Sequence, residues 1–489
     1  MRLPPSRSDR GVALALTSVG IACLAACHVG PNYRVPALPP GAEAAPVSFD
    51  TALETSAPPP EAWWRLYDDP RLDQLVHEAL TANRDLAAAD ANLVAARAAL
   101  AAVHAERYPS TDVVASGVYG RDPTTEAILG LGGHRPQTLW LFEDVFQVAY
   151  EVDLFGRIHR AIEQANANAE SVAATRDSVR VVVASETTQA YAEICALGEQ
   201  LSVARHSLDI VTREAEITEQ RYEAGGNSQF DVQRSAALVS QVSATIPLLE
   251  GQRRGALFEV TALLGRTPAY APRELEACVT PPRLSVLIPV GDGRTLIRRR
   301  PDVRQAERRL AATTAAIGVA TADLYPTIRL TGFYGSAAFE LSQLTTNAAV
   351  ISGVGPSISW SFPNQAGPRA RVRQAKAGQA AALASFDSVV LTALKETEQA
   401  LSTYRAALDS RQALLDARDS IHRSFEIARE EAAAGSLTPL DLLTTQQTLV
   451  TLDAAVASSD TTLVQDQIAI FKALGGGWET DALQARGHR

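Results

Sequence analysis

The segment AERYPSTDVVASGVYG (residues 105–120) decides the fold, because the chain repeats it as ADLYPTIRLTGFYG (residues 322–335). In both copies a helical pattern stops at Tyr-Pro and a strand-like run begins. Further along, EAGGNSQFDVQ (223–233) is matched by AAGSLTPLDLLTTQQ (433–447). Since these landmarks recur in the same order at a nearly constant spacing, the sequence predicts a tandem duplication.

Each copy is expected to hold a helix, a strand, a loop, a second strand, a long helix, a turn and a last helix. The strands are expected at about 111–121, 139–154, 327–335 and 350–362, and the long helices at about 157–223 and 369–434. A helix of about 68 residues is roughly 100 Å long. A compact domain cannot hold such a rod, so we expect an extended helical tube.

The same landmarks set the expected domain boundaries. We expect a signal peptide over 1–26, a lipidated extended segment over 27–69, a first repeat over 70–267, a linker or equatorial segment over 268–291, a second repeat over 292–475 and a tail over 476–489. The linker is assigned where proline is frequent between the two copies.

The N-terminus has the pattern of a targeting segment. A basic stretch precedes an apolar run over 11–22, which is too short to span a bilayer. The run ends in LAAC (24–27), which resembles a bacterial lipobox with cleavage before Cys27 and acylation of that cysteine. His28 follows, and the absence of Asp at this place favours the outer membrane. A plain secretory signal with an incidental cysteine is the alternative.

Composition limits the functional class. The net charge of −10 argues against a general nucleic-acid binder, which needs a basic face. The local basic run Arg298, Arg299 and Arg300 is expected to be a solvated helix start. The 8 histidines and 4 cysteines show no metal-ligand spacing, and no catalytic constellation stands out. We therefore expect no enzyme activity, no metal, and no cofactor other than covalent lipid on Cys27.

Cleavage before Cys27 would leave Cys195 and Cys278 as the only cysteines able to pair. Cys195 falls in a helical stretch and Cys278 in the Pro-rich linker. We expect two separate thiols, with a disulfide as the alternative in an oxidising compartment.

The strands alternate apolar and polar residues. In 140–154 the even positions are apolar or aromatic, with Asp144 as the exception, and the later strands repeat the pattern. One interpretation is an amphipathic sheet over a soluble core, and the other is a transmembrane barrel. No spanning helix is expected after Cys27. Because four strands cannot close a barrel, a membrane sheet would require several protomers.

Taken together, these features resemble those of a known family. The lipobox, the duplication, the paired strands and the long helices ending at AGG and AGS turns resemble the TolC-like outer-membrane efflux channels. HVGPNYRVPALPP (28–40), WWRLYDDPRLDQLVHEAL (63–80) and YEVDLFGRI (150–158) are similar to the OprM/NodT-type lipoprotein branch. The motifs are specific in combination and cover nearly the whole mature chain.

The resemblance implies a mixed α and β membrane protein. Three protomers would give a homotrimer with a twelve-stranded transmembrane β-barrel and a long periplasmic α-barrel. It implies a passive exit duct that joins a periplasmic adaptor and an inner-membrane pump of the resistance-nodulation-division (RND) type. The outer part would be surrounded by outer-membrane lipid, and small toxic compounds or drugs would leave through the duct.

The resemblance puts a constriction near the turn before the last helix of each copy. Asp441 matches a position where some members have an acidic ring, and Asp231 is its equivalent in the first copy. Either carboxylate is also explained as a first-turn acid that interacts with the helix dipole. Leu437 and Thr444 stand where some members have a basic residue and a second acidic ring. An apolar constriction involving Leu437 or Leu440 is therefore the preferred hypothesis.

The turns themselves are implied to face the adaptor. They are Gly225-Gly226 in the first copy and Gly435-Ser436 in the second. Glycine at these places is also explained as a simple helix stop.

Two other functions stay open at the level of sequence. The chain would still be a channel if it served a type I protein secretion system. It would be no channel if it were a periplasmic coiled-coil lipoprotein with structural duties. The alternating strands argue against the latter, and ion conduction by a trimer would exclude it.

Overall fold

The computed structural model describes residues 28–42, 54–55, 57–121, 138–284, 286–291 and 293–476. Cys27, the predicted signal segment and all but the first residue of the predicted tail lie outside the described residues. The chain divides into two compact units, described separately below. The sheet unit comprises Met1–Pro36, Val94–Ser171 and Glu307–Ser385, and the helical unit comprises Ala37–Leu93, Val172–Ala306 and Phe386–Arg489.

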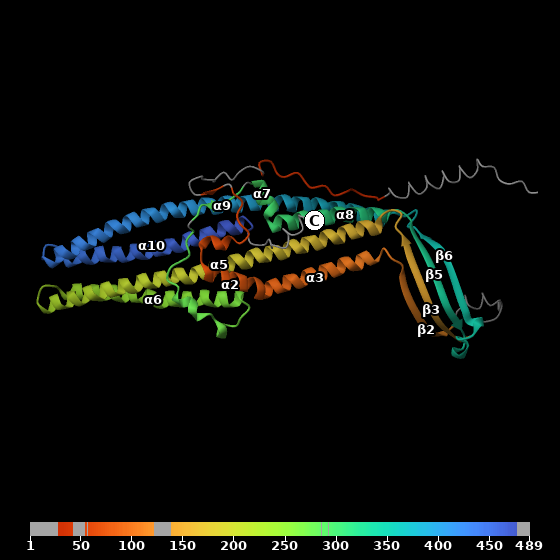
Figure 1. Ribbon diagram of the computed structural model, residues 1–489, viewed down its shortest axis with the longest axis horizontal. Helices are drawn as coiled ribbons and strands as arrows, with labels where there is room; N and C mark the ends of the chain where they lie inside the picture. Colours follow the sequence, from red (N-terminus) through yellow and green to blue (C-terminus); the bar gives the residue numbers. More distant parts are fainter. Residues whose placement is uncertain are drawn as a thin grey trace, which may run out of the picture. The chain divides into compact units, whose positions relative to one another are not determined.

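The sheet unit contains a sheet of four antiparallel strands in the order β2-β3-β5-β6 (Figure 1). The strands are β2 (Ser110–Gly120), β3 (Leu139–Val152), β5 (Thr327–Ala338) and β6 (Val350–Ser359). Strands of one copy pair with each other, and β3 pairs with β5, so this contact joins the two copies. The register sets Phe146 opposite both Val113 and Tyr334, which keeps the apolar positions of neighbouring strands on one face.

Helices enter and leave this sheet at corresponding points of the two copies. Before the strands run α3 (Arg84–Ala105) and α8 (Pro301–Ala322), and after them run α5 (Arg157–Glu223, 67 residues) and α9 (Ala366–Ala433, 68 residues). Pro109 and Pro326 follow α3 and α8 closely, and proline removes a backbone donor and disfavours a helical residue before it. Each Tyr-Pro pair therefore marks the change from helix to strand.

The helical unit has its core where the shorter helices meet the long ones. Its helices include α2 (Pro70–Ala82), α6 (Gln229–Leu263), α7 (Gly293–Arg299) and α10 (Pro439–Ala473). Trp63 stacks on Phe471 with ring centroids 4.7 Å apart, and both side chains are fully buried. Burying two large aromatic side chains contributes several kcal/mol. This contact joins the N-terminal segment to the last helix.

Short elements complete the chain. They are the two-stranded parallel sheet of β1 (Glu54–Thr55) and β4 (Ile288–Pro289), and 3₁₀ turns at Trp63–Tyr67, Pro268–Tyr270, Arg273–Ala277, Leu341–Gln343 and Asn347–Ala349. The turns at Pro268–Tyr270 and Arg273–Ala277 form the first part of the linker between the copies.

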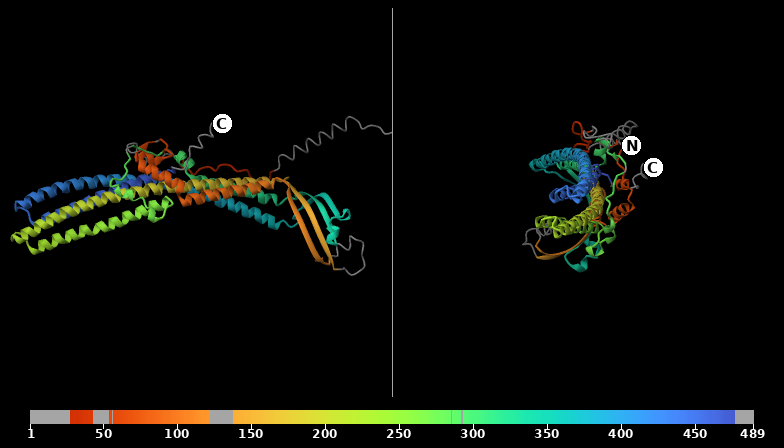
Figure 2. Two further views of the ribbon diagram at one scale, coloured as in Figure 1. Left: turned by 60° about the horizontal axis from the view of Figure 1, so that its bottom comes forward. Right: turned by 90° about the vertical axis from the view of Figure 1, so that its left-hand side faces the viewer.

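Two helical hairpins lie side by side in the helical unit, one made by α5 and α6 and the other by α9 and α10 (Figures 1 and 2). A buried cluster of Val211, Leu238 and Val242 packs against Leu443 and Val450 of α10. The apolar contact therefore runs between equivalent helices of the two copies.

The predicted element order and the duplication are confirmed. Helix α5 begins and ends at the predicted residues, whereas β6 ends at Ser359 and α9 begins at Ala366, each three residues before its predicted bound. The Asn364 side chain accepts a hydrogen bond from the backbone N–H of Ala366 at 3.2 Å, which caps the new helix early.

The expectation of a solvated helix start at Arg298 to Arg300 is wrong for Arg300, and Arg298, although exposed, lies at a helix end. Helix α7 ends at Arg299, and Arg300 is buried between α7 and α8. Its guanidinium donates to Asp302 at 2.7 Å, to Glu396 of α9 at 2.8 Å and to the carbonyl of Ala473 at 2.8 Å. A buried charge requires such partners, so Arg300 joins three helices.

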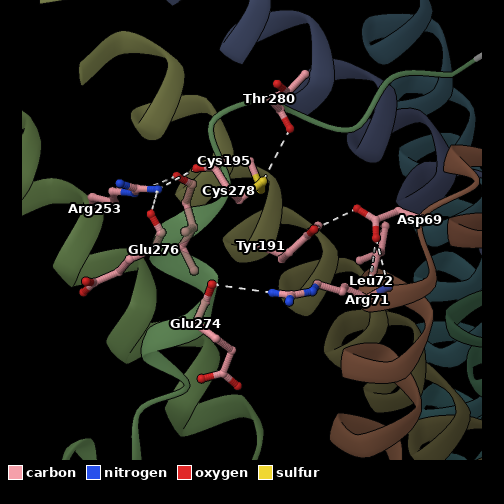
Figure 3. Close-up of a disulfide and its surroundings, with 11 residues drawn as sticks. Asp69, Arg71, Leu72, Tyr191, Cys195, Arg253, Glu274, Glu276, Cys278 and Thr280 are labelled. Atoms are coloured by element: carbon pink, nitrogen blue, oxygen red, sulfur yellow. Dashed lines mark hydrogen bonds between the residues drawn. A yellow bond between two sulfur atoms is a disulfide. The ribbon is translucent and has the colours of Figure 1, made fainter. Parts of the chain in front are cut away.

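The expectation of two separate thiols is also wrong. Cys195 of α5 and Cys278 of the linker form a disulfide, with their Cα atoms 4.8 Å apart (Figure 3). The pair is separated by 83 positions in sequence, and nothing in the local pattern around either cysteine brings them together. The linker crosses α5 at this point, which only the folded chain reveals.

Two described helices, Arg84–Ala105 and Ala366–Ala433, contain windows long and apolar enough by composition to cross a membrane. The sequence interpretation had expected no such helix. Both windows are rich in alanine, and length with composition alone is weak evidence for a span.

Candidate pore constriction and membrane-facing sheet

The two hairpin turns lie together at one end of the helical unit (Figures 1 and 2). Gly225 has φ +79° and Gly435 has φ +77°. The next residues donate back to the helix, Gly226 N–H to the carbonyl of Arg221 at 2.7 Å and Ser436 N–H to that of Glu431 at 3.0 Å. Each helix therefore ends at a glycine in the left-handed backbone conformation, which glycine adopts without steric cost.

Each following helix starts with a hydroxyl cap and an acid three residues later. Ser228 accepts from Asp231 N–H at 3.3 Å, and its hydroxyl donates to the Asp231 carboxylate at 2.6 Å. Thr438 accepts from Asp441 N–H at 3.2 Å and donates to the Asp441 carboxylate at 2.6 Å. Both acids therefore stabilise a helix start. The capping role of each acid is complete within a single chain.

The two leucines named from the sequence lie at the second turn. Leu440 is 43% exposed, and Leu437 is partly buried beside it in the turn. The Thr444 hydroxyl donates to the carbonyls of Leu440 and Asp441, both at 3.0 Å, so it is satisfied within its own helix. Leu440 therefore presents apolar surface next to the Asp441 carboxylate.

Sequence reasoning missed Phe230 at the first turn. Its side chain is 67% exposed, and the guanidinium of Arg234 lies 5.5 Å from the ring centroid. Counting from the cap residue, Phe230 stands where Leu440 stands in the second copy. Aligning the turns by their caps would have found it, so each turn carries one exposed apolar side chain beside an acid.

The sheet presents an apolar face that the described residues leave exposed. Val354 is 81% exposed, Ile358 70% and Tyr334 63%. The opposite face holds polar pairs, such as Arg329 with Glu151 at 3.3 Å. Of the described strands, β2 and β6 each pair on one side only, so both edges of the sheet are open.

The segment after Cys27 is fixed to the start of α5 within the sheet unit. Arg160 is almost fully buried and donates to the carbonyls of Val29 and Gly30 and to the Asn32 side chain. The rings of His28 and His159 lie with centroids 4.1 Å apart. The residue that follows the predicted lipid site is therefore held at the junction of β3 and α5.

The chain is similar in sequence and in structure to several known proteins. The sequence profile of the family Outer membrane efflux protein matches residues 75–266 and 294–476. Nodulation protein T of Rhizobium leguminosarum bv. viciae is 28% identical over 93% of this chain and 92% of that protein. Outer membrane protein OprJ of Pseudomonas aeruginosa is 30% identical over 93% of this chain and 94% of that protein. The solved structure of the outer-membrane channel OprN is similar with a TM-score of 0.85 and 34% identity, over 92% of this chain and 100% of that one.

Proposed function

Since the chain belongs to the outer membrane efflux protein family and is an outer-membrane efflux channel, we propose that three copies of it assemble around one pore. The pore passively conducts small toxic compounds or drugs to the exterior. A periplasmic adaptor and an inner-membrane pump of the RND type deliver them. The family consists of channels, and we propose that this chain catalyses no reaction.

The open sheet edges support this assembly. Backbone groups of β2 and β6 that lack a neighbouring strand would be unpaired in lipid, at a cost of several kcal/mol each. Pairing β2 of one copy with β6 of the next satisfies both edges. Three copies then give twelve strands, enough to close a barrel around an aqueous lumen.

The docked N-terminal segment supports the lipid anchor at Cys27. Val29 N–H donates to the carbonyl of Phe155 at 3.3 Å, three residues after β3 ends. An acyl chain on Cys27 would start next to the end of the sheet. Acyl chains bury roughly 0.8 kcal/mol per CH₂ in lipid, so the anchor and the sheet would insert together.

The remaining roles belong to the same proposal. The division into signal, lipidated segment, two repeats, linker and tail keeps the boundaries given above. The turns Gly225-Gly226 and Gly435-Ser436 contact the adaptor, since both are exposed at the same end of the helical unit.

Assembly and conduction test the proposal together. The purified full-length protein should run as a trimer when unheated and as a monomer when boiled. The same preparation should conduct ions in planar bilayers. A monomer that stays soluble without detergent and conducts nothing would contradict the proposal.

The gate is assigned to apolar side chains and not to a charge lock. Threefold repetition brings three copies of Leu440 together, beside three Asp441 carboxylates that attract cations. Leu440→Ala should raise single-channel conductance, because it widens the constriction and keeps the cap of Thr438 and Asp441. Leu248→Ala, at an exposed position of α6 away from the turn, is the control. Unchanged conductance in Leu440→Ala would reject the apolar gate.

A further inference from the structure

The linker forms one wall of a pocket in the helical unit. Its volume is about 400 Å³, and its other walls come from α5 and α6. The 3₁₀ turns Pro268–Tyr270 and Arg273–Ala277 close it from the linker side. The residues that line the pocket include none of those at the hairpin turns.

Positive charge exceeds negative charge in this pocket. Four arginines line it, against two glutamates: Arg205, Arg253, Arg254 and Arg273, with Glu250 and Glu276. Arg205 forms a salt bridge with Glu250 at 2.8 Å. The lining then has three further guanidinium groups and one further carboxylate, that of Glu276. Such an excess attracts anions.

Arg253 is the fixed member of the set. Among the described residues its guanidinium donates to backbone carbonyls, those of Ile194, Glu276 and Cys278, at 3.2, 2.5 and 2.5 Å (Figure 3). Burial lowers the pKa of this group, which remains charged at neutral pH. Its hydrogen bonds therefore go to backbone carbonyls, and the Glu276 carboxylate interacts with it electrostatically.

The disulfide holds this wall in position. Cys278 is bonded to Cys195 of α5, and a Cβ at Gly198 would come within 2.2 Å of the Cys278 carbonyl. The absence of a side chain at Gly198 lets the linker lie directly on α5. The pocket is therefore preorganised, which reduces the entropy lost on binding.

An apolar surface lies beside the charges. Phe258 is 46% exposed and lines the pocket together with Leu257 and Pro268. We propose that this pocket binds small organic anions, with a carboxylate or phosphate group on the arginines and an apolar or aromatic body on Phe258. Guanidinium groups recognise both kinds of anion through paired N–H donors.

Titration calorimetry on the full-length channel in neutral detergent tests this. The probes are benzoate for a carboxylate and phenyl phosphate for a phosphate ester, with benzyl alcohol as the uncharged match. We expect saturable binding of one or both anions and none of the alcohol. Raising the ionic strength from about 0.02 M to about 0.3 M should weaken binding, because the site is partly exposed to solvent.

The variants identify the site. Arg254→Ala and Arg273→Ala change exposed side chains and should each weaken anion binding about three- to tenfold. Arg213→Ala, an exposed arginine elsewhere on α5 that pairs with Asp209, is the matched control and should bind as the wild type does. Equal affinity in all three variants, or equal binding of benzyl alcohol, would overturn the proposal.

Discussion

At the scale of single residues, Asp466 of α10 carries a carboxyl group whose burial destabilises the folded state when the group is ionised. Its Oδ2 atom is buried and has no hydrogen-bond partner among the described residues. Burial raises the pKa of this group above its usual range. The folded state therefore binds the proton more tightly than the unfolded state does. The stability it contributes is complete below the unfolded pKa and is lost as the pH rises through the folded pKa.

We therefore expect Asp466→Asn to raise the melting temperature at about pH 7.5 and to leave it unchanged at about pH 3, below the usual pKa of an aspartate. Asp453→Asn is the control. Arg418 binds the Asp453 carboxylate at 2.9 Å, so this variant should have a lower melting temperature at neutral pH. Circular-dichroism melting at both pH values measures the difference. A lower melting temperature of Asp466→Asn at about pH 7.5 would contradict the account.

Single residues are also where prediction from sequence was weakest. Arg300 looked like part of a solvated basic run, yet its partners lie on α8, α9 and α10. The acids Asp231 and Asp441 were located correctly at helix starts, because a cap and its acid are close in sequence. Contacts between distant segments leave no such local pattern. A pore role for either acid stays a prediction.

At the scale of elements, prediction succeeded because the signals are local. Tyr-Pro pairs end the helices α3 and α8, alternation marks the strands, and the glycines with positive φ end α5 and α9. The local structure of the linker and its bond to α5 were not predicted from the sequence. Between Pro268 and Pro289 it has 3₁₀ turns and one short strand, and a disulfide joins it to α5.

Removing that disulfide should cost stability at the linker. The free energy of unfolding of the double variant Cys195→Ala, Cys278→Ala is expected to be lower by about 2–4 kcal/mol, since the bond closes a long loop in the unfolded chain. The measurement is the denaturant midpoint of the purified protein. Reducing agent should lower the midpoint of the wild type and leave that of the double variant unchanged. A wild type that does not respond while its disulfide is verified as reduced would count against this role.

At the scale of the whole molecule, the duplication explains why one chain carries only part of a membrane structure. Each copy supplies two strands, and the β3–β5 contact joins them into a sheet that still has two open edges. Alternation alone left open whether the apolar face covers a soluble core. In the folded chain Val354 and Ile358 remain 81% and 70% exposed, so the described residues supply no cover for them.

If lipid covers the apolar face of the sheet, a substitution on that face and a matched substitution on the polar face of the same strand should differ in effect. Val354 lies opposite Gly332 on the apolar face, whereas Gly355 lies opposite Thr331 on the polar face and has space for a side chain. An arginine facing lipid near the middle of the bilayer costs about 2–4 kcal/mol, but one facing a wet lumen costs little. Val354→Arg should therefore reduce the amount of heat-modifiable trimer in the outer membrane, and Gly355→Arg should not. Because both changes add the same side chain to β6, a general effect on folding would lower both. If Gly355→Arg abolished the trimer and Val354→Arg did not, the two faces would have to be exchanged.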